Sequence, residues 1–404
     1  MKTTMRRALT IGGLLLVAAI VLAPAIQAKD IKVGAAINLT GPASTWGQYH
    51  AKGTQDYFRY VNEVKGGVKG TKVTMITVDT AYKPAEAVAA VRKFAMQEKV
   101  DMIATWGAGE GIQAKPLLQK FKIPALNYST AWELLQPPVD YMFLPFGSYK
   151  LDCAVVMEYI AAVHKGPRAP KVGLLTYNNA YGRSIHEPSK EYVKGKNIEI
   201  VSIEEFPPQT VDLTTELLRL KQKGAQYVFM QMLPAAIIST LKGADRIGYK
   251  PMFIGTWTST DPDFFKNGKG LLRDRVKMQF CGALPSDNVP GMKIMKELWM
   301  RYKTVDSFDT AYWEGVVVGM IMERAFLRAK EKYGQVNPGN IATAMETFRN
   351  EDFGGLVPNI TYTKEYHGAS FTGRIVQIHA DGTFTPLTGF LTPGQGPIKL
   401  LGTK

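Results

Sequence analysis

The stretch VDLTTELLRLKQKGAQYVFMQM, residues 211–232, decides the fold class because it contains one complete helix-to-strand unit. Leu213, Leu217 and Leu220 fall on one face at helical spacing. Gly224 is the residue type that commonly ends a helix, and the apolar run after it is typical of a strand buried on both faces. The stretch therefore predicts an amphipathic helix followed by a buried strand.

The same unit recurs along the chain, and this alternation predicts an α/β protein with parallel sheets covered by helices. In such sheets, ligands bind outside the carboxyl ends of the strands. Near the C-terminus the pattern changes, because the turn pair Asp381-Gly382 separates two strands of a predicted antiparallel hairpin, 373–379 and 383–391. The other predicted strands are 31–39, 72–79, 102–106, 123–128, 171–176, 227–232 and 252–255.

The first residues have the features of an export signal. Basic residues precede the apolar run 8–23, and small Ala28 follows the helix-breaking Pro24. We expect residues 1–28 to be a signal peptide cleaved near Ala28, which predicts a soluble periplasmic protein. The alternative is an uncleaved membrane anchor, although the apolar run is at the short end for a spanning helix.

Composition limits the function classes. The chain has 404 residues, 46% apolar and 21% charged, which is a globular composition with room for two domains. The net charge of +14 comes from lysines and arginines without a basic run, so we read it as a solvated surface and predict no nucleic-acid partner. The five histidines lack the close spacing of a zinc site, and no nucleophile-elbow or Walker pattern occurs. We expect no metal, no cofactor and no enzyme activity.

One glycine-rich turn stands out in DMIATWGAGEGIQAKPLLQKF, residues 101–121. Gly107, Gly109 and Gly111 separate a predicted strand from a predicted helix, where a flexible backbone can bring N–H groups to an anion. The turn does not fit the dinucleotide fingerprint, because Ile112 stands where the third glycine is required. A carboxylate at the helix N-terminus is the ligand that this turn favours.

Distinctive residues follow several of the predicted strands. Trp106 precedes the glycine turn, Tyr128-Ser129-Thr130 follows another strand, Tyr181 follows Asn178-Asn179, and Trp257 follows Gly255. If two sheets face each other, these strand ends converge on one crevice. Trp106 and Trp257 are each either walls of that crevice or ordinary core residues.

Five segments carry a family resemblance: IKVGAAINLTGPASTWGQYHAKG, VTMITVDTAYKPAEAVAAVRKF, YNNAYGRS, GADRIGYKPMFIGTW and FTGRIVQIHADGTF. Through them the chain, from Ile31 to about Leu391, resembles the solute-binding proteins of ABC uptake systems in the branched-chain amino-acid family, which have the type I periplasmic binding fold. The resemblance implies two doubly wound parallel-sheet lobes joined by a three-strand hinge, with the ligand in the interlobe cleft. It places lobe 1 at 29–147 plus 282–356 and lobe 2 at 148–281 plus 357–404.

The resemblance also implies a binding site. It matches Trp46 and Tyr181 to ligand-contacting aromatic residues of the family, and Gly109, Glu110 and 128–130 to the positions that hold the ligand's carboxylate. Glu110 either binds an amine or stabilises the first turn of its helix. The candidate ligand-binding residues are Trp46, Trp106, Gly109, Glu110, Tyr128, Ser129, Thr130, Tyr181, Leu233 and Trp257.

Two departures from the family pattern bear on the ligand. Trp257 stands where the family has an acidic residue that holds the α-ammonium group, and Leu233 replaces a pocket tyrosine. A buried ammonium without a carboxylate partner is costly. We therefore expect an aromatic or hydrophobic organic acid, the alternative being a branched-chain or other amino acid.

The expected partners are a small-molecule ligand and, by transient docking, an ABC permease of the inner membrane. We expect a monomer whose lobes close by a hinge near Gly147, Cys281 and Leu356. The same fold also serves ligand sensing, so a receptor subunit is the alternative function. The two cysteines, Cys153 and Cys281, lie near the predicted hinge and either form a disulfide or stay free and buried.

Overall fold

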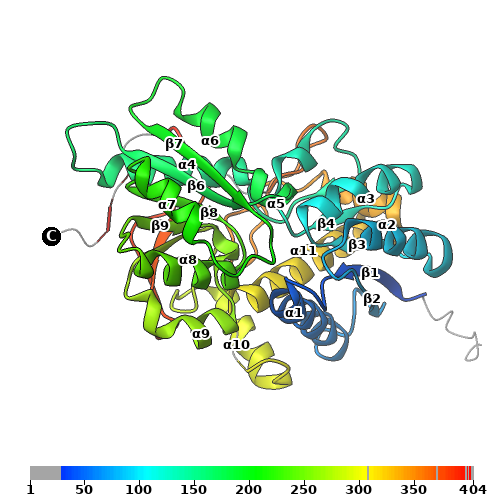
Figure 1. Ribbon diagram of the computed structural model, residues 1–404. Coiled ribbons are helices and arrows are strands. Elements are labelled where there is room, and N and C mark those ends of the chain that lie inside the picture. The colour runs from blue at the N-terminus through cyan, green and yellow to red at the C-terminus, as the bar shows by residue number, and fades with distance from the viewer. Residues whose placement is uncertain (1–28, 307–308, 370–371, 396–397, 399, 402–404) are drawn as a thin grey trace, which may run out of the picture.

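Two β-sheets with different strand orders organise the protein. The computed structural model describes residues 29–306, 309–369, 372–395, 398 and 400–401, so the predicted signal peptide lies outside the described residues. The strand orders are β2-β1-β3-β4-β5 and β12-β11-β10-β9-β8-β6-β7. Figure 1 shows the two sheets in two lobes that lie side by side, each with helices packed around its sheet. The predicted α/β fold with two parallel-sheet lobes is confirmed.

Lobe 1 contains a five-stranded sheet whose paired strands all run parallel. Its strands are β1 (Ile31–Ile37), β2 (Val73–Asp79), β3 (Met102–Thr105), β4 (Ala125–Asn127) and β5 (Met142–Phe143). Its helices are α1 (Ser44–Glu63), α2 (Pro84–Lys93), α3 (Ala108–Phe121), α10 (Pro290–Tyr302), α11 (Thr310–Tyr333) and α12 (Pro338–Met345), with short turns η1 (Phe94–Glu98) and η2 (Trp132–Leu135).

Lobe 2 contains a seven-stranded sheet that is parallel except for the C-terminal hairpin. Its strands are β6 (Lys171–Tyr177), β7 (Glu199–Phe206), β8 (Tyr227–Gln231), β9 (Met252–Gly255), β10 (Val276–Phe280), β11 (Arg374–Ile378) and β12 (Phe384–Pro386). Its helices are α4 (Tyr149–Val163), α5 (Ala180–Arg183), α6 (His186–Val193), α7 (Thr214–Gln222), α8 (Pro234–Arg246) and α9 (Pro262–Leu272), with the turn η3 (Trp257–Ser259).

The unit that the sequence analysis started from forms as predicted. Helix α7 follows Asp212, whose carboxylate accepts a hydrogen bond from the Thr214 N–H at 2.9 Å. Gly224 has φ +72°, the left-handed conformation that ends a helix at little cost for glycine. Strand β8 is buried along its whole length because it pairs with β6 on one side and β9 on the other. The predicted hairpin also forms, as β11 and β12. Strand β7 was missed, because EIVSIEEF mixes charged and apolar residues at the edge of its sheet.

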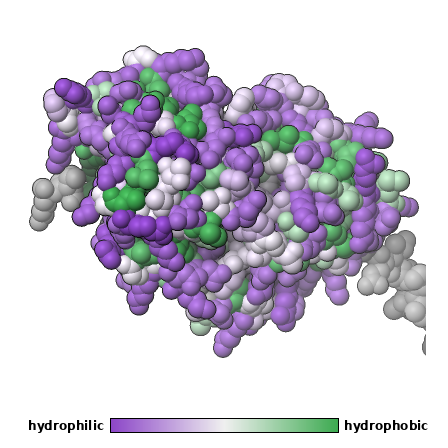
Figure 2. Space-filling view, viewed as in Figure 1, coloured by the Kyte–Doolittle hydropathy of each residue, from purple (hydrophilic) through white to green (hydrophobic). Residues whose placement is uncertain are grey.

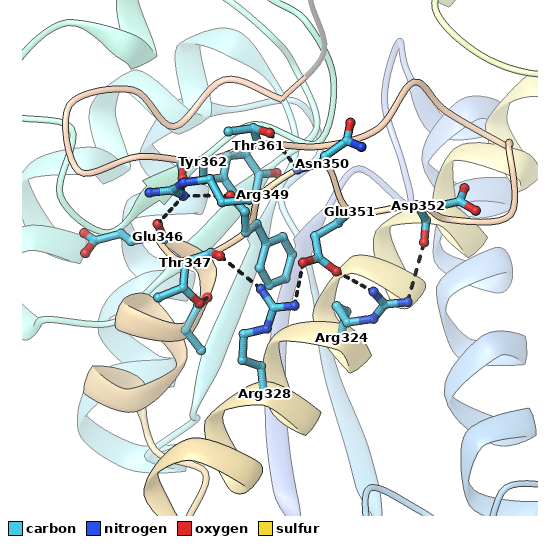
Figure 3. A network of polar contacts seen from close by, with 12 residues as sticks. Arg324, Arg328, Glu346, Thr347, Arg349, Asn350, Glu351, Asp352, Thr361 and Tyr362 are labelled. Atoms are coloured by element: carbon cyan, nitrogen blue, oxygen red, sulfur yellow. Dashed lines mark hydrogen bonds and ion pairs between the residues drawn. The ribbon is translucent and has the colours of Figure 1, made fainter.

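The chain crosses between the lobes three times: after β5, after β10 and before β11. The segment before the third crossing is tied to lobe 1. Arg324 and Arg328 on α11 both bond the carboxylate of Glu351, and Arg349 donates to the backbone carbonyl of Tyr362 (Figure 3).

The contacts of this segment continue beyond Leu356. The Tyr362 hydroxyl donates to the Leu144 carbonyl at 2.8 Å, and the Leu144 N–H donates to the His367 carbonyl at 2.9 Å. The lobe boundaries remain a proposal, and these contacts favour extending lobe 1 from residue 356 to about residue 369.

Cys153 and Cys281 are free and buried, so the disulfide that the sequence left open is not formed. The Cys153 sulfur lies 3.7 Å from the backbone carbonyl oxygen of Ile185. Burial raises the pKa of both thiols, which keeps them protonated. Neither cysteine stabilises the hinge by a covalent bond.

The surface is mainly hydrophilic. On the face shown in Figure 2, apolar side chains form small separate groups between polar ones. Within the described ranges, no helix combines the length and the hydrophobicity that crossing a bilayer requires. The same ranges contain no group of three or more His, Cys, Asp or Glu side chains placed to hold a metal ion.

Candidate ligand-binding site

A cavity lies between the lobes, where the carboxyl ends of strands from both sheets meet. Trp106 follows β3, Tyr128 follows β4, Leu233 follows β8 and Trp257 follows β9, so the two sheets contribute to one site as the rule for α/β sheets predicts. The space not filled by atoms is about 310 Å³ when open solvent is included, but the centre of a water-sized sphere can reach only about 20 Å³ of it, so the cavity is nearly filled by its own side chains in this structure. It is lined by Trp46, Tyr82, Trp106, Gly107, Ala108, Tyr128, Ser129, Tyr149, Tyr181, Leu233, Trp257, Thr258 and Glu314.

The lobes are in contact around this cavity. The ring of Trp46, on α1 of lobe 1, meets the ring of Trp257, on η3 of lobe 2, edge to face at a centroid distance of 6.2 Å. Beside it, the Thr45 hydroxyl donates to the Asp263 carboxylate at 2.8 Å, and the hydroxyls of Thr260 and Thr310 are 3.1 Å apart. The structure therefore represents a closed arrangement of the lobes.

Lobe 1 offers hydrogen-bond donors to this cavity. The N-terminus of α3 opens toward it, since Gly107 and Ala108 are part of the lining. Ser129 also lines it, with its hydroxyl 3.4 Å from the Tyr149 hydroxyl. The Tyr128 hydroxyl is buried without a hydrogen-bond partner among the described residues. Helix N-terminal N–H groups and hydroxyls together are suited to a carboxylate.

The glycines of the turn serve close packing rather than an unusual backbone conformation. The N-cap residue Gly107 has φ −77°, and neither Gly109 nor Gly111 adopts positive φ. A Cβ at Gly107 would lie 2.2 Å from a carboxylate oxygen of Glu110, and one at Gly111 would lie 2.3 Å from the side-chain oxygen of Asn127. The expectation that these glycines provide backbone freedom is corrected accordingly.

Glu110 points away from the cavity and stabilises the helix start. Its Oε2 accepts hydrogen bonds from the Gly107 N–H at 2.8 Å and the Asn38 side-chain amide at 3.3 Å. Its Oε1 accepts a hydrogen bond from Thr80. Burial raises the pKa of Glu110, and these hydrogen bonds oppose that shift. The structure thus gives Glu110 the capping function, which was one of its two predicted roles.

Most of the predicted site residues come together in the cavity. Gly109, Glu110 and Thr130 do not line it, although the Thr130 hydroxyl is buried without a partner in the described part of the chain. The predicted residues that do line it are Trp46, Trp106, Tyr128, Ser129, Tyr181, Leu233 and Trp257. Their contact with a ligand stays a prediction.

Five lining residues were missed by the sequence analysis: Tyr82, Ala108, Tyr149, Thr258 and Glu314. Gly107 was predicted as part of the anion-binding turn but was not named as a ligand-binding residue. Tyr82 follows the end of β2 and has φ +61°, which is uncommon for a non-glycine residue. Its place after a predicted strand was a usable signal. Glu314 was identifiable only as a single acid within an apolar stretch of a long helix, AYWEGVVVGM at 311–320.

Lobe 2 contributes hydroxyls and apolar surface to the lining. The hydroxyls of Tyr181 and Thr258 are hydrogen-bonded, and Thr256 continues the chain to Thr258 at 3.1 Å and to the Gln231 amide oxygen at 2.9 Å. Burial raises the pKa of Tyr181 to about 12, so it stays a neutral donor. The residues of lobe 2 that line the cavity include no ionisable acid or base other than the phenols of Tyr149 and Tyr181.

Glu314 is the carboxylate of the lining, and it comes from lobe 1. Its Oε2 accepts a hydrogen bond from the Trp46 indole N–H at 2.9 Å and lies 3.0 Å from His50 Nδ1. Helices α1 and α11 approach closely here because glycines face the contact. A Cβ at Gly53 would lie 2.3 Å from the Tyr312 carbonyl oxygen, and a Cβ at Gly315 would lie 2.1 Å from the His50 carbonyl oxygen, so a larger residue would force the helices apart. The glycines thus allow these side chains to meet.

Comparison with known proteins identifies the class of this fold. A family model described as periplasmic binding protein matches residues 30–383. The chain belongs to the periplasmic binding protein family. This family consists of binding proteins of transport systems, and the protein is a periplasmic solute-binding protein of ABC transport.

The known proteins that this chain resembles differ in the ligands that their names give. The chain is 25% identical over 297 residues to the Leu/Ile/Val-binding protein homolog 7 of Brucella suis, covering 70% of this chain and 74% of that protein. It is 25% identical, with a TM-score of 0.83, to a branched-chain amino acid ABC transporter protein of Thermus thermophilus with bound valine, covering 91% and 97% of the two chains. A fatty acid substrate-binding protein of Thermomonospora curvata shares the fold at 19% identity, with a TM-score of 0.82 and coverage of 92% and 95%.

Proposed function

We propose that this protein captures a small carboxylate-bearing ligand with an aromatic or hydrophobic body between its two closing lobes. It then delivers the ligand to an ABC permease of the inner membrane. The observation that carries the proposal is the division of the cavity: donor groups of Ala108 and Ser129 lie on lobe 1, and the apolar surfaces of Leu233 and Trp257 lie on lobe 2. A ligand that is charged at one end and apolar at the other satisfies both lobes at once.

Closure follows from this division. A ligand stabilises the closed form only by the interactions that it makes there and not in the open form. Binding of the carboxylate needs lobe 1 alone, whereas burial of the apolar body against Tyr181, Leu233 and Trp257 requires lobe 2 to close on lobe 1. The carboxylate therefore provides initial binding, and the apolar body provides the free energy that closes the lobes.

An amino acid is the second candidate ligand. It is favoured by the carboxylate of Glu314 in the lining and by the names of the Brucella and Thermus relatives. The first candidate is favoured by the apolar residues Leu233 and Trp257 on the opposite side of the cavity.

A thermal-shift panel on the chain from Lys29 onward tests the proposal. The panel compares leucine, isoleucine and valine with benzoate, phenylacetate, hydroxycinnamates and aliphatic acids, and it includes the matched amide or alcohol of each acid. A ligand at about 100 times its dissociation constant adds about 2.7 kcal/mol to the free energy of unfolding, which raises the melting temperature measurably. The expected result is a shift with carboxylates and none with matched amides or alcohols. A shift with the uncharged analogues would contradict the carboxylate requirement.

The remaining parts of the proposal concern location and assembly. We propose cleavage near Ala28 and a monomer that docks transiently on its permease. Amino-terminal sequencing of the protein from a periplasmic extract checks the first point, and light scattering on the purified protein checks the second. A mature chain that begins elsewhere, or a stable dimer, would contradict them.

A further inference from the structure

Glu314 has one carboxylate oxygen without a partner. Both hydrogen-bond contacts of its carboxylate, with the Trp46 indole and with His50, are made by Oε2. Oε1 is buried and has no hydrogen-bond partner among the described residues. Only 1% of the Glu314 side chain is exposed, yet the residue lines the interlobe cavity. A buried carboxylate oxygen is rarely left unsatisfied, so a partner from outside the protein is indicated.

The charge of Glu314 is not offset by lysine or arginine. Within the described part of the chain its ion-pair partner is His50, a buried side chain that is charged only when protonated. A neighbouring buried carboxylate, Glu323 on the same helix, is instead paired with Lys65 and hydrogen-bonded to Tyr57. The two acids thus have different environments: Glu323 is satisfied within the protein, whereas Glu314 lines the cavity and keeps one carboxylate oxygen without a partner among the described residues.

The position of Glu314 is held from several sides. The Trp46 ring that bonds its Oε2 is itself packed against Trp257, and His50 packs against the Tyr128 ring at a centroid distance of 3.6 Å. Trp46 and Tyr128 also line the cavity. A carboxylate held by its neighbours in this way is preorganised for a partner and has little freedom to turn elsewhere.

We propose that Glu314 Oε1 accepts a hydrogen bond from the ligand, so that the ligand carries an ammonium or hydroxyl donor in addition to its carboxylate. This inference rests on the proposed function and narrows its ligand class. A ligand carboxylate without such a donor would place two carboxylates in one small cavity, where their repulsion is poorly screened. The donor relieves this repulsion and satisfies Oε1. Both polar groups of the ligand are then held by lobe 1, and its apolar body faces lobe 2.

Isothermal titration calorimetry with matched ligands tests the inference. One series is 4-methylpentanoate, 2-hydroxy-4-methylpentanoate and leucine, which differ only in having no donor, a hydroxyl or an ammonium at the same carbon. A second series is 3-phenylpropanoate, 3-phenyllactate and phenylalanine, and a further pair, phenylacetate and 4-hydroxyphenylacetate, places the donor on the ring. The wild-type protein should bind a donor-bearing compound at least tenfold more tightly than its donor-free analogue.

The variant Glu314→Gln identifies the acceptor and the kind of donor. Glutamine keeps a neutral acceptor oxygen but removes the negative charge. An ammonium ligand should lose at least tenfold in affinity, a hydroxyl ligand should lose less, and a donor-free acid should be unchanged or bind more tightly. Glu323→Gln is the matched control, since it removes a buried acid from the same helix and should leave the order of affinities unchanged. Melting curves without ligand show that both variants are folded.

The results separate this inference from the proposed function. If donor-free acids bind as tightly as their donor-bearing analogues and Glu314→Gln changes neither, the inference is wrong and the proposed function stands. If no carboxylate in the panel binds, the proposed ligand class and this inference are both wrong. Equal losses in Glu314→Gln and Glu323→Gln would show a general structural effect and would also overturn the assignment.

Discussion

Trp46 and Trp257 come from opposite lobes and meet edge to face, with ring centroids 6.2 Å apart and an interplanar angle of 61°. Trp46 is anchored in lobe 1 by the hydrogen bond from its indole to Glu314, and Trp257 packs against Phe146 and Tyr149 near the first crossing. Hinge opening must separate the two indoles, because each is attached to its own lobe. Their contact is therefore a feature of the closed form alone.

Replacing Trp257 with alanine should weaken ligand binding by about 2 kcal/mol, roughly 30-fold in dissociation constant, because a buried aromatic wall of the cavity is lost. Binding is measured by calorimetry with whichever acid gives the largest thermal shift. Closure is followed by tryptophan fluorescence, which should change on ligand addition in the wild type and change less in the variant.

Trp299→Ala is the control for this substitution. Trp299 lies on α10, outside the cavity lining, and its indole donates to the Val305 carbonyl at 3.0 Å. Its loss is expected to lower stability without changing affinity. A folded Trp257→Ala protein with unchanged affinity would remove Trp257 from the ligand-contacting set.

The closed interface should respond to pH through two carboxylates that cap helices on opposite lobes. Burial raises the pKa of Asp309, the N-cap of α11, to about 7, and the charge of Asp261, the N-cap of α9, adds to the increase. Burial likewise raises the pKa of Asp261 to about 6, with the charge of Asp263 adding to it. The pKa of Tyr49 on α1 is also raised. Burial is the largest cause, and the negative charges of Asp309, Asp306 and Asp263 add to it.

The sign of this effect follows from proton binding. The usual pKa of an aspartate is 3.8, so the closed protein holds more protons than the unfolded chain between about pH 4 and pH 7. The free energy of unfolding should therefore rise as the pH falls from 8 to 5. Above about pH 7 both carboxylates are ionised, and the destabilisation caused by their buried charges is fully present. Lobe opening also separates Asp261 from Asp309, so ligand affinity should rise in the same direction.

Urea unfolding and ligand titration across pH 5 to 8 check this expectation. In the double variant Asp261→Asn and Asp309→Asn the caps are kept, because asparagine also accepts the capping hydrogen bonds. The variant should be more stable than the wild type at pH 8 and less sensitive to pH. Asp212→Asn serves as the control, since the pKa of that carboxyl is lowered to about 2 by Thr214 and Arg246 and it does not titrate in this range. Parallel pH profiles of the wild type and the double variant would contradict the role of this pair.

The fold and much of the cavity were predictable because both rest on local patterns. Strand ends are marked by changes from apolar to turn residues, and parallel sheets gather those ends at one edge, which places Trp106, Tyr128 and Trp257 together. Glu314 was not predictable in this way. It lies 268 residues from Trp46 in the second turn of α11, and only the packing of α1 on α11 brings the two together. Side-chain rotamers cannot be predicted from the sequence pattern either, so the sequence could not decide which way Glu110 points.

The two thiols should stay unreactive in the native protein. Cys153 and Cys281 are buried and free, so a reagent in solvent cannot reach them. Burial also raises the pKa of both thiols, so the reactive thiolate form is not populated. Titration with a thiol reagent in the absence of reductant should detect no reactive cysteine in buffer and both cysteines in concentrated guanidinium. The variant Cys281→Ala should give one reactive thiol after unfolding. An unfolded wild-type protein without reactive thiols would show that the disulfide forms after all.

The orientation of Glu110 leads to a test that separates its two predicted roles. Its carboxylate accepts hydrogen bonds from the Gly107 N–H, Asn38 and Thr80, all of them buried. Glu110→Ala removes the acceptor of the Gly107 N–H and of the Asn38 amide, whereas the Thr80 hydroxyl can still donate to the Asn38 side-chain oxygen, and it should lower the free energy of unfolding by about 1–3 kcal/mol.

Urea unfolding of the apoprotein measures this loss, and Glu86→Ala provides the matched control. Glu86 is an exposed acid in the first turn of α2, so its removal should cost a few tenths of a kcal/mol at most. Ligand affinity, measured at a temperature where Glu110→Ala is fully folded, should change much less than in Trp257→Ala, because Glu110 lies behind the helix start and outside the cavity lining. Unchanged stability together with a tenfold loss of affinity would instead assign Glu110 to the ligand, and the capping geometry would then not describe its function.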